Sequence, residues 1–403
     1  MTVSMDAALA DGTTCRACGS PVSPGERYCE SCGAELPSAE AAGGQPPAPA
    51  GDGPAGGAPI PAAVVTAAPN LDAAPGTCPA CSGRVADDGY CELCGAPAVR
   101  PRDHWVEQPV SWVAAVCDRG VRHYRNEDAV ALAGTAGEGP GGASGRTARS
   151  GRFAVLVVCD GVSSSADSDI ASLAAAQAAR DVLAGAEPAA GQPEDGEPAT
   201  QDPAAPNADT RDRTRAGTDR VQVLARRIRR AAEAADAQVR ASAGSPPSPN
   251  PPACTFAAAV VEDGLLLAGW VGDSRVYWLA DDGPAVQLSV DDSWATEQVA
   301  LGVPREEAEQ APQAHEITRW LGLDSPDAVP RTASTALNAA GWVLVCSDGL
   351  WNYCSPAAGL RDLVREVVAA AGTDPAAAAG ELVTWANRQG GRDNVTVALA
   401  RIA

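Results

Sequence analysis

Two short apolar runs end abruptly in an Asp-Gly pair, a pattern that can present carboxylates to a metal ion. Residues 156–159 precede Asp160-Gly161, and residues 343–346 precede Ser347-Asp348-Gly349. Apolar, β-branched runs of this length predict buried strands, so each aspartate should stand at a strand tip. The glycine lets the backbone turn or bring its carbonyl close to an ion. Carboxylates gathered by a rigid sheet are the ligands that hard cations such as Mg²⁺ and Mn²⁺ prefer.

These pairs belong to an ordered series of motifs. Singly, each aspartate could be a cap or turn residue, which is how we interpret Asp281, Asp282 and Asp263-Gly264. As a series, the motifs resemble those of the metal-dependent PPM-type (type 2C) Ser/Thr protein phosphatases, over about residues 111–402. The series is Asp118-Arg119-Gly120, Arg125-Asn126-Glu127-Asp128, Asp160-Gly161, Thr255, Gly272-Asp273-Ser274-Arg275, Ser347-Asp348-Gly349 and Asp393-Asn394-Val395-Thr396.

The resemblance implies a metal centre and the residues that hold it. Asp160 would bridge two Mn²⁺ or Mg²⁺ ions, and the Gly161 carbonyl would bind one of them. Asp348 and Asp393 would complete the ligands of the other ion. Asp273 matches a carboxylate that holds a third ion in many bacterial members. Two cations neutralise a phosphate monoester and lower the pKa of a bridging water, which then attacks in line.

The motif around residues 122–128 matches the family only in part. Glu127 and Asp128 would hold metal-bound waters and complete the catalytic set with the three metal-binding aspartates. Four residues before the motif glutamate the family usually has a phosphate-contacting Arg, but this chain has His123. Arg122 and Arg125 lie on either side of it. If the segment is extended, His123 and Arg125 face the same way, which makes Arg125 the best candidate for the phosphate contact.

The implied function is Mn²⁺- or Mg²⁺-dependent hydrolysis of phosphoserine and phosphothreonine on proteins. After Gly161, many members continue with Met-Gly-Gly-His, whereas residues 162–165 here are Val-Ser-Ser-Ser. The alternative is therefore a catalytically weak, phosphatase-like regulatory or binding module. Because the three main metal-binding aspartates are intact, we favour the enzyme. Residues 291–324 correspond to the flap that borders the cleft in relatives; we interpret its Trp294 and Trp320 as packing residues, and His315 as a surface residue or a general acid.

Eight of the 13 cysteines form Cys-x-x-Cys pairs before residue 95, and the other five lie in or beside apolar runs. Four thiolates presented as two pairs fit tetrahedral Zn²⁺, and the tandem resembles a double zinc ribbon. A redox role is the alternative, but that motif normally accompanies a βαβ unit, which is not predicted here. We expect two Zn²⁺ ions that are mainly structural and ribbons that position a partner or substrate. The ligands would be Cys15, Cys18, Cys29 and Cys32, and Cys78, Cys81, Cys91 and Cys94.

Composition limits the partners and the compartment. The formal net charge is −21, Lys is absent, and residues 1–100 hold only four arginines, so nucleic-acid binding is not expected. The sequence has no apolar run that approaches a membrane span, and its cysteine usage suits a reducing compartment. We expect a cytoplasmic, monomeric, bacterial protein that acts on phosphoproteins, such as a Ser/Thr kinase or its targets.

The predicted fold class is α+β: an αββα sandwich of two antiparallel sheets flanked by helices, preceded by two small zinc ribbons. The predicted parts are ribbon 1 (1–35), a disordered Ala/Gly/Pro linker (36–76), ribbon 2 (77–97), a linker (98–110) and the phosphatase domain (111–403), with low-complexity insertions near 134–151, 185–219 and 243–252. Strands are predicted near 111–117, 128–133, 153–159, 255–262, 265–271, 274–279, 342–347 and 395–402, and helices near 168–184, 220–242, 292–302, 356–371 and 375–389.

Overall fold

The computed structural model describes most of the chain from residue 77 onward. It covers 77–135 apart from 79–80, 87–89 and 97, and then 152–185, 209–245 and 248–403; in 209–218 only the backbone is described. The predicted first ribbon, the linker 36–76 and most of the insertions near 134–151 and 185–219 lie outside these residues.

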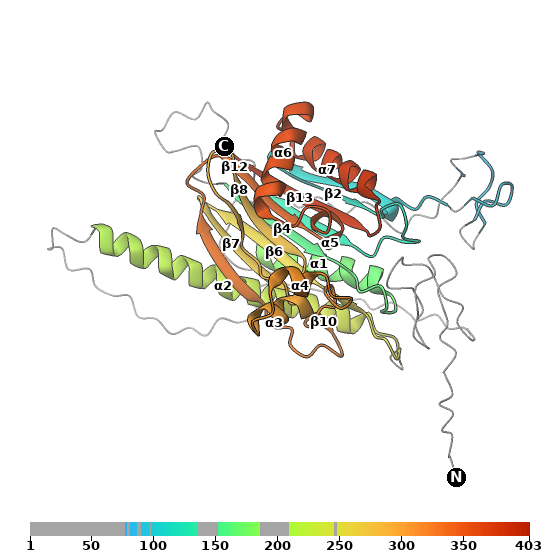
Figure 1. The fold of residues 1–403 in the computed structure, drawn as a ribbon, viewed down its shortest axis with the longest axis horizontal. Helices are drawn as coiled ribbons and strands as arrows, with labels where there is room; N and C mark the ends of the chain where they lie inside the picture. Colours follow the sequence, from blue (N-terminus) through green and yellow to red (C-terminus); the bar gives the residue numbers. More distant parts are fainter. Residues whose placement is uncertain are drawn as a thin grey trace, which may run out of the picture.

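Two antiparallel sheets face one another at the centre of the molecule (Figure 1). The first has the strand order β1 (His104–Val110), β2 (Val113–Asp118), β13 (Val395–Ile402), β12 (Gly341–Cys346), β8 (Arg275–Ala280) and β9 (Ala285–Gln287). The second has the order β11 (Arg331–Ala336), β7 (Leu265–Val271), β6 (Phe256–Glu262), β4 (Phe153–Cys159) and β3 (Ala129–Gly134). A short pair joins β10 (Leu321–Gly322) to β5 (Ala253–Cys254).

Helices cover the outer face of each sheet. The first sheet packs against α6 (Ala357–Ala371) and α7 (Pro375–Gln389), and the second against α1 (Ser168–Ala184) and α2 (Asp209–Ala241) (Figure 1). Three apolar cores result, one between the sheets and one under each helix pair. The shorter elements are η1 (Pro101–Asp103), α3 (Trp294–Ala300), α4 (Arg305–Glu309) and α5 (Asp348–Trp351). The predicted αββα sandwich is confirmed.

The central strand β4 shows how the sequence builds these layers. Ala154, Leu156 and Val158 lie in the core between the sheets, whereas Val155 and Val157 lie under the helices. Because both faces are covered, the strand is apolar throughout and does not alternate with polar residues. Fully burying a Val or Leu side chain contributes about 1.5–3 kcal/mol, so such strands fix the site at their ends in a stable frame.

The predicted elements are largely confirmed. All eight predicted strands are present, and each end lies within two residues of its predicted position. Helices α1 and α7 have the predicted bounds, and α6 and α3 differ by at most two residues at either end. Helix α2 approaches the second sheet closely: a Cβ on Gly269 of β7 would lie 2.2 Å from Ile228 of α2.

Three boundaries need correction. The linker expected at 98–110 contains η1 and β1, an edge strand that pairs with β2. Its alternation was obscured by Glu107, a buried residue whose carboxylate accepts the N–H of Leu132 at 3.1 Å. Helix α2 begins at Asp209, inside the insertion expected at 185–219. In the insertion expected at 243–252, Asn250 is ordered and hydrogen-bonds Ala166 and Ser164.

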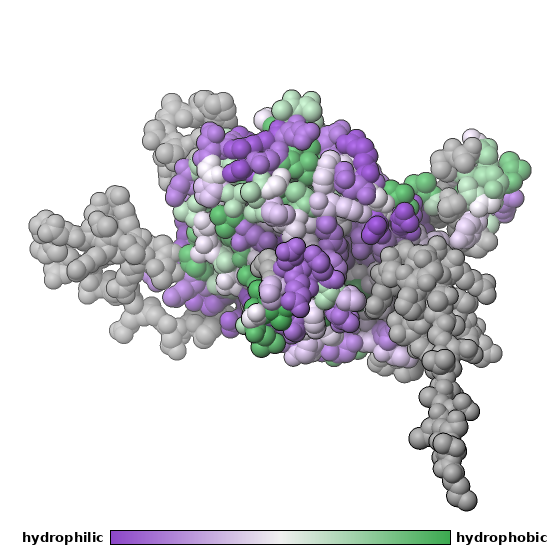
Figure 2. Space-filling model, viewed as in Figure 1, coloured by the Kyte–Doolittle hydropathy of each residue, from purple (hydrophilic) through white to green (hydrophobic). Residues whose placement is uncertain are grey.

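The surface agrees with the acidic composition. Figure 2 shows a mainly hydrophilic face on which hydrophobic side chains occur in separate groups. Among the described residues, none of the helices is both long enough and apolar enough to cross a bilayer.

Candidate active site

Four aspartates from both sheets line one cavity of about 660 Å³. Asp160 follows β4, and Asp273 lies between β7 and β8. Asp348 follows β12 as the first residue of α5, and Asp393 lies just before β13. The strand ends of two facing sheets meet at this edge, so residues more than two hundred positions apart in sequence share one cavity.

The four carboxylates lie close enough for their charges to interact. Burial, and then the neighbouring carboxylates, raise the pKa values of Asp160, Asp273 and Asp348 well above the usual range, and raise that of Asp393 to about 7. The buried Oδ1 atom of Asp348 has no hydrogen-bond partner, while its Oδ2 atom accepts from Asn352 at 2.9 Å. A divalent cation would relieve both the repulsion and the unpaired oxygen, so the donor set fits Mg²⁺ or Mn²⁺.

Glycines allow the backbone to close around these ligands. Gly161 lines the cavity, and a Cβ there would lie 2.7 Å from the Glu127 carbonyl oxygen. Gly120 has a φ of +76°, and a Cβ on it would lie 2.1 Å from the carbonyl oxygen of Asp393. Any larger residue at either position would displace the backbone beside a cavity aspartate.

Asp128 and Glu127 lie behind the cavity wall and do not line it. Asp128 is buried, and its Oδ2 atom accepts hydrogen bonds from Ser347 Oγ at 2.6 Å and Thr396 Oγ1 at 2.7 Å. It also raises the pKa of Asp160 through its charge. Glu127 accepts from Ser168 Oγ at 2.6 Å. The predicted role of both residues in holding metal-bound water stays a prediction.

The three candidate phosphate-binding residues have different surroundings. His123 is buried, and its Nε2 atom lies 3.1 Å from Asp393 Oδ1. Arg125 is bound by carboxylates: its guanidinium lies 2.7 Å from Glu127 Oε1 and 3.3 Å from Asp169 Oδ1. Arg122 is exposed. His123 and Arg125 do turn inward while Arg122 turns outward, although the segment consists of turns and bends and is not a strand.

None of these three residues is among the described residues that line the cavity. A phosphate contact by Arg125 would require its guanidinium to exchange at least one carboxylate for phosphate. The phosphate-binding assignments therefore stay predictions.

Asn394 has a structural role that its motif alone did not indicate. Its Oδ1 atom accepts the N–H of Glu127 at 2.7 Å, and its Nδ2 group donates to the carbonyl oxygens of Arg119 and Arg125. It therefore ties the loop before β13 to the loop between β2 and β3. The only sequence signal was its position beside Asp393 at the start of a strand.

Two further segments line the cavity: the serines after Gly161, which were not predicted to do so, and the flap, which was expected to border it. Ser163, Ser164 and Ser165, from the segment that departs from the family pattern, line it together with Asn250. The flap segment contributes Pro312, His315, Glu316, Ile317, Trp320 and Asp324. The interpretation of Trp320 as a packing residue is therefore incomplete, because this side chain also borders the cavity. Trp294, as expected, packs in a small cluster formed by α3 and α4.

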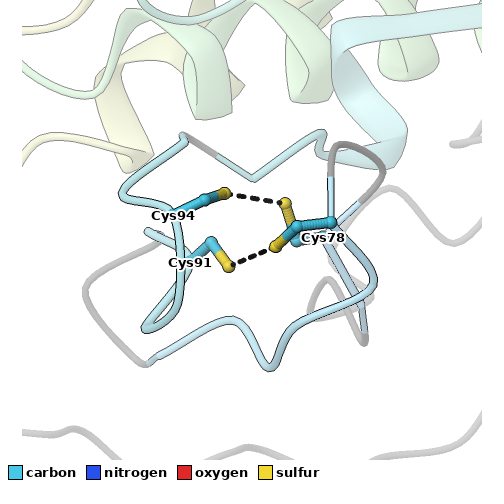
Figure 3. A group of neighbouring side chains, drawn as sticks. Cys78, Cys91 and Cys94 are labelled. Atoms are coloured by element: carbon cyan, nitrogen blue, oxygen red, sulfur yellow. Dashed lines mark hydrogen bonds between the residues drawn. The ribbon is translucent and has the colours of Figure 1, made fainter.

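A separate cysteine cluster has the geometry of a metal site. The Sγ atoms of Cys78, Cys81, Cys91 and Cys94 all lie within 4.8 Å of one another (Figure 3). Cys78 and Cys94 are 3.6 Å apart and Cys81 and Cys91 are 3.4 Å apart at sulfur. Zn–S bonds of 2.3 Å in a tetrahedron imply S···S distances of about 3.8 Å. The N–H groups of Cys94 and Leu93 lower the pKa of Cys91 to about 6, which favours the thiolate.

The other predicted cluster, Cys15, Cys18, Cys29 and Cys32, lies outside the described residues. The five remaining cysteines are free thiols in or beside the cores, as expected.

Comparison with known proteins places the chain in a family. Residues 143–386, more than half of the chain, match the family model described as protein phosphatase 2C. Protein phosphatase PhpP of Streptococcus pneumoniae is 32% identical over 146 residues, which cover 36% of this chain and 56% of that protein. Serine/threonine phosphatase stp of Listeria innocua is 31% identical over 146 residues, which cover 36% and 55%. The matched segment thus spans about half the length of these relatives.

Among solved structures, the Mycobacterium tuberculosis serine/threonine phosphatase PstP/Ppp is similar with a TM-score of 0.49 and 26% identity, over 74% of this chain and 98% of that one. On the strength of the family-model match, the chain belongs to the protein phosphatase 2C family.

Proposed function

We propose that this protein hydrolyses phosphoserine and phosphothreonine monoesters on proteins, using two or three Mn²⁺ or Mg²⁺ ions. The observation that carries the proposal is the convergence of Asp160, Asp273, Asp348 and Asp393 on one open cavity, with a buried and unpaired oxygen on Asp348. Family membership and the curated relatives named as serine/threonine phosphatases support it.

The chain's own residues would supply the ligands and hold them in place. When bound, the cations would neutralise phosphate charge and lower the pKa of an attacking water. Asp160, Asp348 and Asp393, with the Gly161 carbonyl, are the proposed ligands, and Asp273 would serve a further ion. Asp128 orders Ser347 through a 2.6 Å hydrogen bond next to Asp348. His123 lies 3.1 Å from one oxygen of Asp393 and fixes its direction. The serines of 163–165 and Asn250 offer hydrogen-bond donors to a phosphopeptide.

The test is hydrolysis of a phosphothreonine peptide with and without Mn²⁺, by the wild type and by Asp348→Asn. We expect activity that disappears in excess EDTA, and a loss of about a hundredfold or more in the variant. The free energy of unfolding of metal-free Asp348→Asn should be no lower than that of the wild type, because one of the mutually repelling charges is gone. Asp282→Asn, in the exposed β8–β9 turn, is the control for a lost carboxylate elsewhere. Full activity in EDTA or in Asp348→Asn would refute the proposal.

The proposal extends to the zinc sites, the substrates and the role of the cysteine modules. We place one Zn²⁺ at Cys78, Cys81, Cys91 and Cys94 because of their sulfur distances, and a second at the corresponding cysteines of the first module. Phosphoproteins, among them a Ser/Thr kinase or its targets, are the proposed substrates of a cytoplasmic monomer. The cysteine modules would position a partner or substrate.

A further inference from the structure

The lining of the cavity is strongly acidic. Besides the four central aspartates, Glu316 and Asp324 line it, and no arginine is among the described residues that do so. Lys is absent from the whole chain. Two arginines of neighbouring segments are already engaged: Arg275 of β8 lies 2.6 Å from Asp291, and Arg319 of the flap lies 3.1 Å from Asp292.

Trp320 and Asp324 form an ordered pair on this wall. The indole Nε1 atom of Trp320 donates to Asp324 Oδ1 at 2.9 Å. Asp324 Oδ2 makes no hydrogen bond or ion pair with the described residues, and the Glu316 carboxylate is exposed and likewise unpaired among them. An aromatic face beside a carboxylate with one available oxygen suits an arginine or lysine side chain, which can stack on the ring and pair with the acid.

The wall that carries this pair is anchored to the fold. Strand β10 follows Trp320 directly and pairs with β5, and the N–H of Gly322 donates to Asp236 of α2 at 2.9 Å. Ser325 Oγ donates to the Trp320 carbonyl at 2.5 Å. The backbone carbonyl of Glu316 accepts the N–H of Trp294 at 2.8 Å, which fixes this residue as well. A subsite built on this wall would therefore be largely formed before a substrate arrives.

Charge balance indicates what the wall would bind. Two divalent cations would leave the six lining carboxylates with an excess of about two negative charges, and three would offset them. In either case a phosphate group would bring about two further negative charges. Glu316 and Asp324 would then repel the substrate unless it carries positive charge of its own. We propose that Trp320, Asp324 and Glu316 form a subsite for an arginine or lysine side chain next to the phosphorylated residue, so that the enzyme selects basic phosphopeptides. This inference rests on the proposed function.

The experiment compares two phosphothreonine peptides that differ only in their flanking residues, Arg in one and Glu in the other. The kcat/KM of the full-length protein with Mn²⁺ is measured for each and divided by its kcat/KM for p-nitrophenyl phosphate. We expect the wild type to favour the Arg peptide by about tenfold or more, and Asp324→Asn and Trp320→Leu each to reduce that preference about threefold to tenfold, as for one partly exposed ion pair or cation–π contact.

The matched control is Glu307→Gln, on α4 of the same flap, which changes the net charge equally but does not line this cavity. If this control reduces the preference as much as Asp324→Asn, the overall charge of −21 is responsible and the subsite is refuted. A preference that survives in the Glu316→Gln/Asp324→Asn double variant refutes it as well.

Failure of the proposed function would give a different result. If neither the phosphothreonine peptides nor p-nitrophenyl phosphate is hydrolysed with Mn²⁺, the enzyme assignment is wrong, and the subsite is then judged from peptide binding alone by calorimetry in EDTA. A preference for the Arg peptide that Asp324→Asn removes and Glu307→Gln retains would support the subsite. Equal binding of the two peptides to the wild type would overturn it.

Discussion

At the scale of single residues, Arg125 connects the motif glutamate to the helix behind the site. Its guanidinium contacts Glu127 at 2.7 Å and Asp169 of α1 at 3.3 Å, and the Glu127 side chain is only 3% exposed. A buried carboxylate that loses its cation keeps the desolvation penalty without the compensating attraction. Arg125 therefore has a structural role in this loop whether or not it also contacts phosphate.

This role gives a stability prediction. Arg125→Ala should lower the free energy of unfolding by about 3 kcal/mol, because it leaves Glu127 buried without its cation. Urea denaturation of the wild type and the variant measures the difference. Arg122→Ala, which removes an exposed arginine three residues earlier, should change the value by less than about 0.5 kcal/mol. Adding Glu127→Gln to Arg125→Ala should recover part of the loss.

Equal stability of Arg125→Ala and Arg122→Ala would contradict the structural role. The activity of the same variants tests the phosphate assignment separately. We expect Arg125→Ala to lower catalytic efficiency on a phosphopeptide by roughly tenfold to a thousandfold if the arginine supplies a charge-stabilising contact. Near-wild-type efficiency at saturating Mn²⁺ would assign the phosphate contact to another group.

At the scale of elements, the sequence was most informative where burial is complete. Strand β4 and helix α1 have the predicted bounds, because an unbroken apolar run and a regular Ala stripe leave little ambiguity. Strand β1 was missed because its inward-facing positions include Glu107, whose partner, the Leu132 N–H, lies on β3 and cannot be read from local sequence. The first turns of α2 were missed because residues 209–219 are polar and charged, contain Gly217 and show no apolar period.

The start of β1 makes a contact that should be visible in the pH dependence of stability. His104 Nδ1 lies 2.7 Å from Asp118 Oδ2 at the end of β2. The hydrogen bond to Asp118 raises the pKa of His104, although burial opposes the shift. A histidine with a raised folded-state pKa stabilises the fold below its unfolded pKa of about 6.5, and this contribution disappears as the pH rises through the folded-state value.

We therefore expect His104→Gln to be less stable than the wild type at pH 6 by about 0.5 kcal/mol, a small value because the pair is partly exposed. The difference should shrink towards pH 8, where His104 is neutral. Urea denaturation of both proteins at the two pH values measures it, and the other histidines cancel in the comparison. A stability difference that grows with pH would contradict a raised pKa of His104 in the folded protein.

At the scale of the whole molecule, the site depends on which strand ends meet. The Asp-Gly pairs predicted that Asp160 and Asp348 stand at strand tips, but the sheet order that brings them to one cavity with Asp273 and Asp393 comes from long-range pairing. The flap at residues 291–324 was expected to border the cleft, but which of its side chains line the cavity could not be read from local sequence. Their positions depend on tertiary contacts such as the pairing of β10 with β5. Local motifs identified the four aspartates, and tertiary contacts determined the walls around them.

The cysteine cluster that precedes the sandwich has very little apolar core of its own. Among the described residues of 78–94, Val85 is the one buried aliphatic side chain besides two of the cysteines. An apolar core of this size is too small to hold four thiols together without a further bond. A tetrahedral ion would supply that bond, and the Cys81–Cys91 and Cys78–Cys94 distances already approach those of a Zn–S₄ site.

We expect two Zn²⁺ ions per full-length chain by elemental analysis, and one in Cys78→Ser/Cys94→Ser, because two thiolates cannot keep a structural site closed. Cys354→Ser, which changes a partly buried thiol outside the cluster, should keep both ions. Mn²⁺-dependent hydrolysis of p-nitrophenyl phosphate should persist in the double variant, since no cluster residue lines the cavity. Unchanged zinc content in Cys78→Ser/Cys94→Ser would rule out a metal at this cluster, and lost hydrolysis in a folded variant would mean that the module acts on the catalytic site directly.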